Sequence, residues 1–231
     1  MEEYRHSADE SIQRVKPKLW DPRWYYLNEL LKSIKNVGAT NMNQNMVLLD
    51  FGCGAMPYKI ELQKNIKEYI GADLSDNNNA TVKVSNLGIL NYPDCSVDIV
   101  LSTQVLEHVP DPSIYLSECY RVLKPGGQLV LTTHGYWMYH PDPTDFWRWT
   151  SSGLQKIVKE KNFNITSFEG ILGRAAMGLQ LFQDGVMFKI PKIIRPLFIL
   201  PMQLAILLFD KLEKSKYKKL DACTFILIAK K

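Results

Sequence analysis

Two acids and a pair of glycines in the first half of the chain have the types and spacing of a nucleotide-like cofactor site. The run DFGCG at 50–54 follows an apolar segment, and Asp73 ends a second apolar segment 23 residues after Asp50. Glycines let the backbone turn tightly and approach a ligand, and an acid at the end of a second strand can accept hydrogen bonds from ribose hydroxyls. Pro57 occupies the third glycine position of GxGxxG, which argues against NAD.

Acid–base and aromatic residues crowd into the segment HGYWMYHPDPTDFWRWT, which holds three Trp, two Tyr, two His, two Asp and one Arg. Aromatic faces stack on sugars and other rings, while His and Asp supply acid–base groups. His134, at the end of an apolar run, is the first candidate general base, and His140 with Asp142 or Asp145 is the second. The alternative is a loop that only covers the sheet, held by a pair between Arg148 and Asp145.

These residues follow short apolar runs that alternate with helical patterns. The runs predict strands at 46–51, 68–73, 81–85, 97–102, 128–133, 164–168 and 224–229. Helices are expected at 57–67, 112–123 and 151–161. This alternation is typical of βαβ units, in which ligands bind at the carboxyl ends of the strands. We therefore predict an α/β fold with a Rossmann-like, doubly wound, mostly parallel seven-stranded sheet, an antiparallel C-terminal strand and a helical insertion before that strand.

The first 45 residues predict a helical segment. Asp21 and Pro22 can cap and open a helix, since proline is favoured at the first helical position. Apolar residues then recur at helical spacing from Trp24 to Ile34, and Gly38 is the expected stop. The asparagine-rich stretch 40–45 is expected to be a loop.

Charge is unevenly distributed over this chain of 231 residues, whose net charge is +4. Between Val186 and Lys231 there are ten Lys or Arg and three acids, which suggests an anionic partner at this end. The four cysteines form no CxxC pair, so we predict isolated thiols in a reducing compartment and no metal site. The polar N-terminus has no secretory signal pattern, and we expect a cytoplasmic protein.

The apolar and basic segment at 186–219 does not fit the strand–helix alternation. Its charge-free run is too short to span a bilayer, and Pro201 is expected to break a helix near its start. Peripheral membrane contact at the inner membrane face, a lid over the active site and a dimer face are the alternatives.

Four motifs from Met46 to Thr133 resemble those of class I S-adenosylmethionine-dependent methyltransferases. They are VLLDFGCGAMPY, YIGADLSD, SVDIVLSTQVLEHVPDP and YRVLKPGGQLVLTT, in the order that the family has them. The resemblance implies S-adenosylmethionine as the cofactor, a methyltransferase domain over 46–231 that includes the insertion at about 171–219, and the N-terminal helical segment at 1–45 outside it.

The resemblance also assigns roles to individual residues. Contacts to the methionine part of the cofactor are implied for Asp50, Gly52, Gly54 and Gln104. Asp73 is implied to contact the ribose, and the adenine is implied to contact Leu74, Asn86 and Leu87. In the family, an Asp is common at the position of Asn86. The residue types after the predicted strand at 128–133, and not the resemblance, give the other candidates. They are His134 and His140 as catalytic residues, and Tyr136, Trp137, Asp145, Trp147 and Arg148 as substrate-binding residues.

The acceptor is the open question. HPDPTDFWRWT resembles a segment of methyltransferases encoded with polysaccharide-assembly enzymes, which implies a role in polysaccharide biosynthesis and a small-molecule or glycan hydroxyl, such as a lipid-linked sugar. The alternatives are a lipid or quinone-like ring, or a non-catalytic cofactor-binding module. Nucleic acid is not expected, because STQV replaces the N-P-P-[YF]-type motif after the fourth strand.

Overall fold

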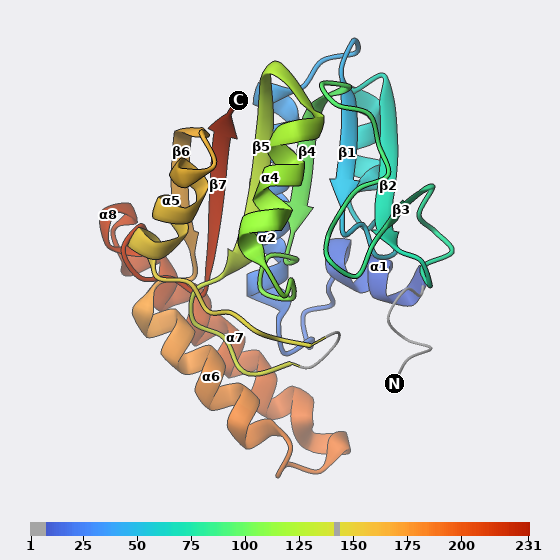
Figure 1. Ribbon diagram of the computed structural model, residues 1–231. Coiled ribbons are helices and arrows are strands. Elements are labelled where there is room, and N and C mark those ends of the chain that lie inside the picture. Colours follow the sequence, from blue (N-terminus) through green and yellow to red (C-terminus); the bar gives the residue numbers. More distant parts are fainter. Residues whose placement is uncertain (1–7, 141–143) are drawn as a thin grey trace.

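The computed structural model describes residues 8–140 and 144–231, and a single sheet organises them (Figure 1). Its strands are β1 (Val47–Phe51), β2 (Glu68–Leu74), β3 (Val82–Val84), β4 (Val97–Thr103), β5 (Leu123–His134), β6 (Asn164–Ile171) and β7 (Thr224–Lys230). Their order across the sheet is β3-β2-β1-β4-β5-β7-β6, and β7 runs antiparallel to both of its neighbours. The predicted fold class is confirmed.

Helices cover both faces of this sheet. They are α1 (Ala8–Val15), α2 (Trp24–Asn41), α3 (Lys59–Leu62), α4 (Pro112–Val122), α5 (Ser151–Glu160), α6 (Arg174–Met187), α7 (Arg195–Leu212) and α8 (Ser215–Lys218). The 3₁₀ turns within residues 8–140 and 144–231 include η2 (Gln63–Asn65) and η3 (Lys192–Ile194). Figure 1 shows α4 in front of the sheet and α2 behind it.

The strands are apolar on both sides because each face has its own core. Leu49 of β1 packs in the cluster that includes Leu116 of α4 and Leu154 of α5. Its neighbour Leu48 packs in the other cluster, with Leu30 of α2. Successive side chains of a strand point to opposite faces, so a strand buried on both sides is a continuous apolar run.

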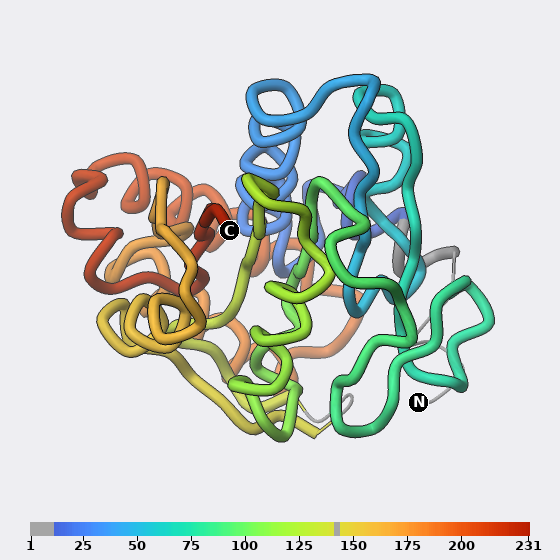
Figure 2. The backbone as a smooth tube through the Cα atoms, turned by 45° about the horizontal axis from the view of Figure 1, so that its top comes forward, coloured from blue at the N-terminus to red at the C-terminus, as the bar shows by residue number. Residues whose placement is uncertain are grey.

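The parallel strands β1, β2, β4 and β5 end at one edge of the sheet, and the chain between β5 and α5 crosses below that edge (Figure 1, Figure 2). This places the glycine run after β1, the acid at the end of β2 and the aromatic segment after β5 in one region. The loops at this edge form the candidate site.

The structure corrects the predicted boundaries of α2. The helix begins at Trp24 without a side-chain cap, and it continues through Gly38 to Asn41. Gly38 is a close-packing position and not a stop, because a Cβ there would lie 2.7 Å from Cδ2 of Leu62. The expected loop therefore begins only after Asn41.

Two further helix predictions are also corrected. The first crossover helix is shorter than 57–67, since only α3 and η2 form there. The second correction is that α7 continues through Pro201 instead of breaking. An interior proline costs a helix about 3 kcal/mol, and buried contacts of Ile199 and Ile206 on the other side of α7 hold it in place.

Candidate active site

A cavity of about 600 Å³ opens at the carboxyl edge of the sheet. One end is lined by residues of the cofactor motifs, namely Gly52, Asp73, Leu74, Asn86, Gln104 and Val105. The other end is lined by His108, His134, Trp137, His140 and Phe146, and by Arg23, Tyr26, Asp184, Met187 and Phe188. The predicted cofactor and acceptor regions thus share one cavity.

The glycine run after β1 requires glycine at its first position. Gly52 has φ +81°, and a Cβ there would lie 2.5 Å from Cγ2 of Val105. The backbone N–H groups of Gly52 and Cys53 donate to the carbonyl of Ala72 at 2.8 and 3.1 Å, which joins this loop to β2. The backbone therefore forms the cavity wall where a side chain would block it.

Asp73 connects the end of β2 to the same loop. Its Oδ2 accepts hydrogen bonds from Gly54 N and Asn77 Nδ2, both at 2.8 Å, and its Oδ1 accepts one from Leu74 N at 2.8 Å. A carboxylate offers about four acceptor positions. One position therefore remains for a further donor, which fits a ribose hydroxyl.

Asp50 lies behind the loop and does not line the cavity. Tyr69 donates its hydroxyl to Asp50 Oδ2 at 2.5 Å. The other oxygen, Oδ1, is buried without a hydrogen-bond partner among the described residues. Burial raises the pKa of Asp50 to about 7. Gly54 also lies outside the lining, and Leu87 is 63% exposed and absent from it.

Gln104 lines the cavity and has a buried side-chain oxygen. Its backbone has φ +57°, and its Nε2 donates to Thr132 Oγ1 at 3.1 Å. Within the described part of the chain, no hydrogen-bond partner reaches its buried Oε1. Buried polar atoms are rarely left unpaired, so this oxygen fits a ligand donor such as the ammonium group of S-adenosylmethionine.

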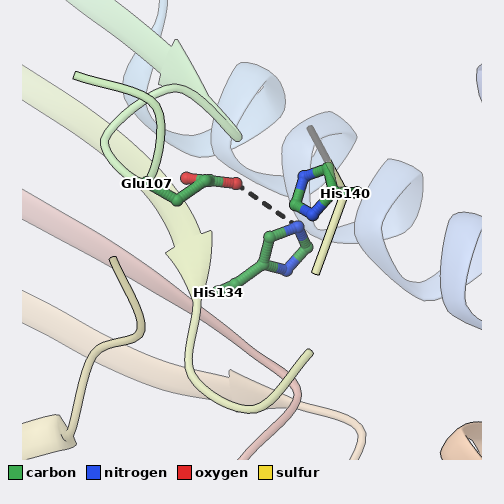
Figure 3. A group of neighbouring side chains, drawn as sticks. All are labelled: Glu107, His134 and His140. Atoms are coloured by element: carbon green, nitrogen blue, oxygen red, sulfur yellow. Dashed lines mark ion pairs between the residues drawn. The ribbon is translucent and has the colours of Figure 1, made fainter. Parts of the chain in front are cut away.

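Glu107 and His134 form a buried pair at the other end (Figure 3). His134 Nε2 lies 3.3 Å from Glu107 Oε1, and His134 Nδ1 lies 3.2 Å from Thr224 Oγ1. Thr133 donates its hydroxyl to Glu107 Oε2 at 2.8 Å. Burial raises the pKa of Glu107 to about 7, and burial also keeps the pKa of His134 well below its ordinary value. His134 is therefore a neutral ring whose two nitrogens both have neighbours.

His140 has Asp145 beside one of its two ring nitrogens, and its ring packs edge-on against His108 and His134. Its Nδ1 lies 3.2 Å from Asp145 Oδ2, and Asp145 Oδ2 also accepts the backbone N–H of His140 at 3.0 Å. Burial lowers the pKa of His140, and the Asp145 charge opposes that shift. Since Nδ1 faces Asp145 and the ring lines the cavity, Nε2 is the nitrogen available to a ligand.

Arg148 fixes Asp145 in this position. The guanidinium makes a two-pronged contact with the carboxylate, at 2.6 Å from Nη1 to Oδ1 and 2.5 Å from Nη2 to Oδ2. Burial alone would raise the pKa of Asp145, but hydrogen bonds from Arg148 and from His140 N hold it below its ordinary value. Asp145 and Arg148 position His140 and do not line the cavity.

The other predicted acceptor-site residues fall in different places. Trp137 lines the cavity and stacks on His134, with ring centroids 5.0 Å apart and planes 1° from parallel. Tyr136 lies outside the lining and its hydroxyl is 3.4 Å from Asp221 Oδ1. Trp147 is also outside the lining and donates Nε1–H to the carbonyl of Val109 at 2.8 Å. Asp142 lies outside the described residues.

Two side-chain groups at this end have the composition of cation sites. They are Glu107 with His134 and His140, and His108 with His140 and Asp145, each with ligand atoms within 4.8 Å of one another. His and carboxylate sets of this kind suit transition metals. These are the positions where an ion would bind, and the absence of a metal remains a prediction.

Sequence reasoning missed one wall of the cavity. Arg23, whose guanidinium carbon is 5.0 Å from the Trp137 ring centroid, comes from the turn before α2, and Tyr26 comes from α2 itself. Asp184 and Phe188 come from the end of α6. No local pattern connects segments about 160 residues apart, although the aromatic start of α2 was a visible signal.

The sheet order, the glycine loop after β1 and the acid at the end of β2 define a Rossmann-like methyltransferase fold of class I. Residues 49–131 match the methyltransferase domain family. This match supports a methyltransferase domain in this part of the chain, and a relative named as a probable S-adenosylmethionine-dependent methyltransferase points to the same cofactor.

Curated relatives carry methyltransferase names. A probable S-adenosylmethionine-dependent methyltransferase of Mycolicibacterium smegmatis is 28% identical over 146 residues, covering 56% of each chain. A ubiquinone biosynthesis O-methyltransferase of Bradyrhizobium diazoefficiens is 35% identical over 112 residues, covering 43% of this chain and 44% of that protein. The chain thus spans about half the length of these curated relatives.

The crystal structure of the 4+2 cyclase SpnF is similar in fold alone. It has a TM-score of 0.60 at 20% identity, covering 91% of this chain and 84% of that one. A cyclase on the same fold is a reminder that fold does not determine the reaction. The acceptor site therefore has to carry the functional argument.

Proposed function

We propose that the protein transfers a methyl group from S-adenosylmethionine to a hydroxyl of a small-molecule or glycan acceptor. The observation that carries this proposal is the single cavity that joins the cofactor-motif residues Gly52, Asp73 and Gln104 to the histidines His134 and His140. A shared cavity places an acceptor beside the cofactor, and proximity supplies much of the rate in such reactions.

In the proposed mechanism, His140 is the general base. Bound S-adenosylmethionine supplies an activated methyl group. Nε2 of His140 accepts the proton of the acceptor hydroxyl as the oxygen becomes the nucleophile, while Asp145 keeps Nδ1–H in place and stabilises the charged ring. His134 instead braces the site, since Glu107 and Thr224 occupy the surroundings of its two nitrogens.

The lining of the acceptor end supports a sugar as the first acceptor candidate. Phe146 offers an aromatic face on which a sugar can stack, and Arg23 and Asp184 offer a donor and an acceptor for hydroxyls. Trp137 adds an aromatic wall, although its ring already stacks on His134. A lipid-linked sugar of polysaccharide assembly agrees with the resemblance of the segment 140–150. Nucleic acid is not an expected partner.

A lipid or quinone-like ring is the second candidate. The names of the ubiquinone biosynthesis O-methyltransferases favour it, and so do Met187 and Phe188, which add an apolar wall to the cavity. The matches to these relatives extend over 39–43% of this chain. They therefore support oxygen methylation more than a particular ring. A non-catalytic cofactor-binding module is the third reading.

Calorimetry with S-adenosylmethionine tests the cofactor site. We expect the wild-type protein to bind and Asp73→Ala to weaken binding at least about tenfold, a loss of about 1.4 kcal/mol. The substitution removes the ribose acceptor and also the hydrogen bond that holds Gly54. Asp76→Ala is the matched control, because Asp76 is exposed two residues beyond β2 and outside the cavity. A folded wild-type protein without affinity would contradict the proposal.

Mass spectrometry of reaction mixtures tests the acceptor. Saccharides, lipid-linked saccharides and catechol-type rings are incubated with the protein and S-adenosylmethionine, and the gain of one methyl mass is measured. Methylation of a saccharide oxygen supports the first candidate, and methylation of the ring alone supports the second. Cofactor binding without any transfer across the panel would favour the non-catalytic module.

A further inference from the structure

The hairpin made by α6 and α7 buries polar side chains and exposes apolar ones, which is the opposite of an ordinary surface helix. Its buried side chains include polar ones at 3% exposure or less, and these are Gln180, Gln183, Asp184, Gln203 and Asp210. A helix at the surface of a globular protein normally turns its apolar stripe inward and its polar side to water. Here polar groups face the rest of the protein.

These buried polar side chains fix the hairpin to the start of α2. The Nε2 groups of Gln180, Gln183 and Gln203 all donate to the carbonyl of Pro22, at 2.9, 2.6 and 2.8 Å. Gln203 Oε1 accepts the backbone N–H of Tyr25 at 2.9 Å. The orientation of the hairpin is therefore set by buried hydrogen bonds, which are costly to break.

The outer side of the hairpin carries large apolar residues. They are exposed by 45–89% and comprise Phe182, Phe188, Ile193, Ile194, Leu197, Leu204, Leu208, Phe209 and Leu212. This corrects the expectation of a run too short to span a bilayer, because Lys192–Leu212 is by length and composition long and apolar enough to cross a membrane. An 18-residue window of this stretch has a mean hydropathy of 1.8, and only 22% of that window is buried in the protein. An exposed apolar surface of this extent marks a binding surface.

We propose that this hairpin docks on a membrane that contains anionic lipid. Charge is the reason for choosing lipid over a second copy of the chain. The sequence has no acid from Gly185 to Phe209, while Lys189, Lys192 and Arg195 stand among the exposed apolar residues at the tip. Two such tips would repel each other, whereas cations beside apolar side chains suit the headgroup layer.

The geometry of the hairpin indicates insertion into one leaflet and not a span. The chain enters α6 from β6 and returns from α7 to β7, so both ends of the hairpin are attached to the same sheet. The 14 residues of α6 make a helix of about 21 Å, shorter than the roughly 30 Å of a hydrocarbon core. Docked in this way, the protein would work at the cytoplasmic face of the membrane.

Docking would also orient the cavity. The hairpin extends past the carboxyl edge of the sheet, where the cavity lies (Figure 1). Met187 and Phe188 at the end of α6 belong both to the hairpin and to the cavity lining. A membrane-bound acceptor would therefore meet the cavity from the lipid side, a consequence that rests on the proposed methyl transfer.

Flotation with lipid vesicles tests the proposal. We expect the full-length protein to float with vesicles of phosphatidylcholine and phosphatidylglycerol, and less with phosphatidylcholine alone. Leu204→Glu with Leu208→Glu should lower the partition coefficient at least about tenfold, since two exposed apolar side chains are lost from the lipid. Substituting Lys189 or Lys192 with Ala removes one positive charge, and each substitution should lower the partition coefficient on the anionic vesicles roughly fivefold.

Ile60→Glu is the matched control. Ile60 is 83% exposed on α3, far from the hairpin in the sequence, so its substitution replaces an exposed apolar side chain with one acid, against two in the hairpin variant, without altering the proposed surface. Thermal unfolding and calorimetry with S-adenosylmethionine check that each variant is folded, because none of these side chains lines the cavity.

Three results would overturn the proposal. They are absence of flotation with anionic vesicles, equal loss in Ile60→Glu and the hairpin variant, and a wild-type dimer in light scattering that Leu204→Glu with Leu208→Glu dissociates while flotation is unaffected. Failure of cofactor binding together with normal flotation would contradict the proposed function and leave the docking surface intact.

Discussion

At the scale of single residues, His140 and His134 differ in what surrounds their nitrogens. Asp145 faces only Nδ1 of His140, and the ring lines the cavity. His134 has Glu107 at one nitrogen and Thr224 at the other. A base that must accept a proton from a ligand needs one nitrogen directed at that ligand, which is why the two histidines should respond differently to substitution.

His140→Gln should lower kcat by about 10²- to 10⁴-fold, the usual contribution of a general base. Affinity for S-adenosylmethionine should change by less than about twofold, because the cofactor residues lie at the other end of the cavity. His134→Gln provides the comparison and should have the smaller effect on kcat. Single-turnover rates and calorimetry measure both quantities. A larger loss for His134→Gln would exchange the roles of the two histidines.

Asp50 should make stability depend on pH. Burial raises its pKa to about 7 from an ordinary value of 3.8. The folded state therefore retains a proton that the unfolded state releases between these values, so stability falls as pH rises through this window. Urea unfolding should give a free energy of unfolding that is lower at pH 8 than at pH 5, by a few kcal/mol at most. Asp50→Asn should make this difference smaller. An unchanged drop in Asp50→Asn, with exposed Asp76→Asn as control, would contradict the assignment.

At the scale of elements, the glycine loop after β1 is the rigid part of the cofactor end. Gly52→Ala should abolish most cofactor binding and destabilise the protein, because the position combines φ +81° with a Cβ 2.5 Å from Val105. Gly178→Ala in α6 is the matched control. No atom lies within 4 Å of a Cβ there, so alanine should stabilise the helix by about 0.5–1 kcal/mol. Chemical denaturation and calorimetry measure both variants, and tolerance of Gly52→Ala would count against a fixed loop.

Helices and strands whose bounds are set by their own residues were predictable from the sequence. β1 and β2 are continuous apolar runs that end in acids, and both strands formed near their predicted bounds. The errors arose where a distant contact decides the outcome. A glycine such as Gly38 is typical of a helix end, yet here it lets α2 pack closely against Leu62 of α3. A proline such as Pro201 usually breaks a helix, yet α7 continues through it while Ile199 and Ile206 are buried against the protein.

The cavity wall formed by the turn before α2 and by α6 illustrates the same limit at the site. Pro22 was expected to open a helix, and instead its carbonyl accepts hydrogen bonds from three glutamines more than 150 positions away. The pattern of any one segment contains no trace of such a pairing. Predictions from the cofactor motifs were better founded, since their residues lie within loops that directly follow single strands.

At the scale of the whole molecule, the buried glutamines, the exposed apolar surface and the cavity belong to one arrangement. Hydrogen bonds to Pro22 determine which side of the hairpin faces outward, and the end of α6 contributes Phe188 to both the outer surface and the cavity. If the hairpin docks on lipid, the advantage should be specific to acceptors that are themselves anchored in lipid, because only these are concentrated at the mouth of the cavity.

Comparing one acceptor in two forms tests this coupling. With anionic vesicles, wild-type protein should methylate a lipid-linked saccharide with a higher kcat/KM than the same saccharide free in solution. Leu204→Glu with Leu208→Glu should lower kcat/KM for the lipid-linked form by about tenfold or more, in line with the weaker partition. The value for the soluble form should remain within about twofold, since neither leucine lines the cavity. An equal loss for both forms would mean that the hairpin supports the cavity itself, and that membrane docking is not what delivers the acceptor.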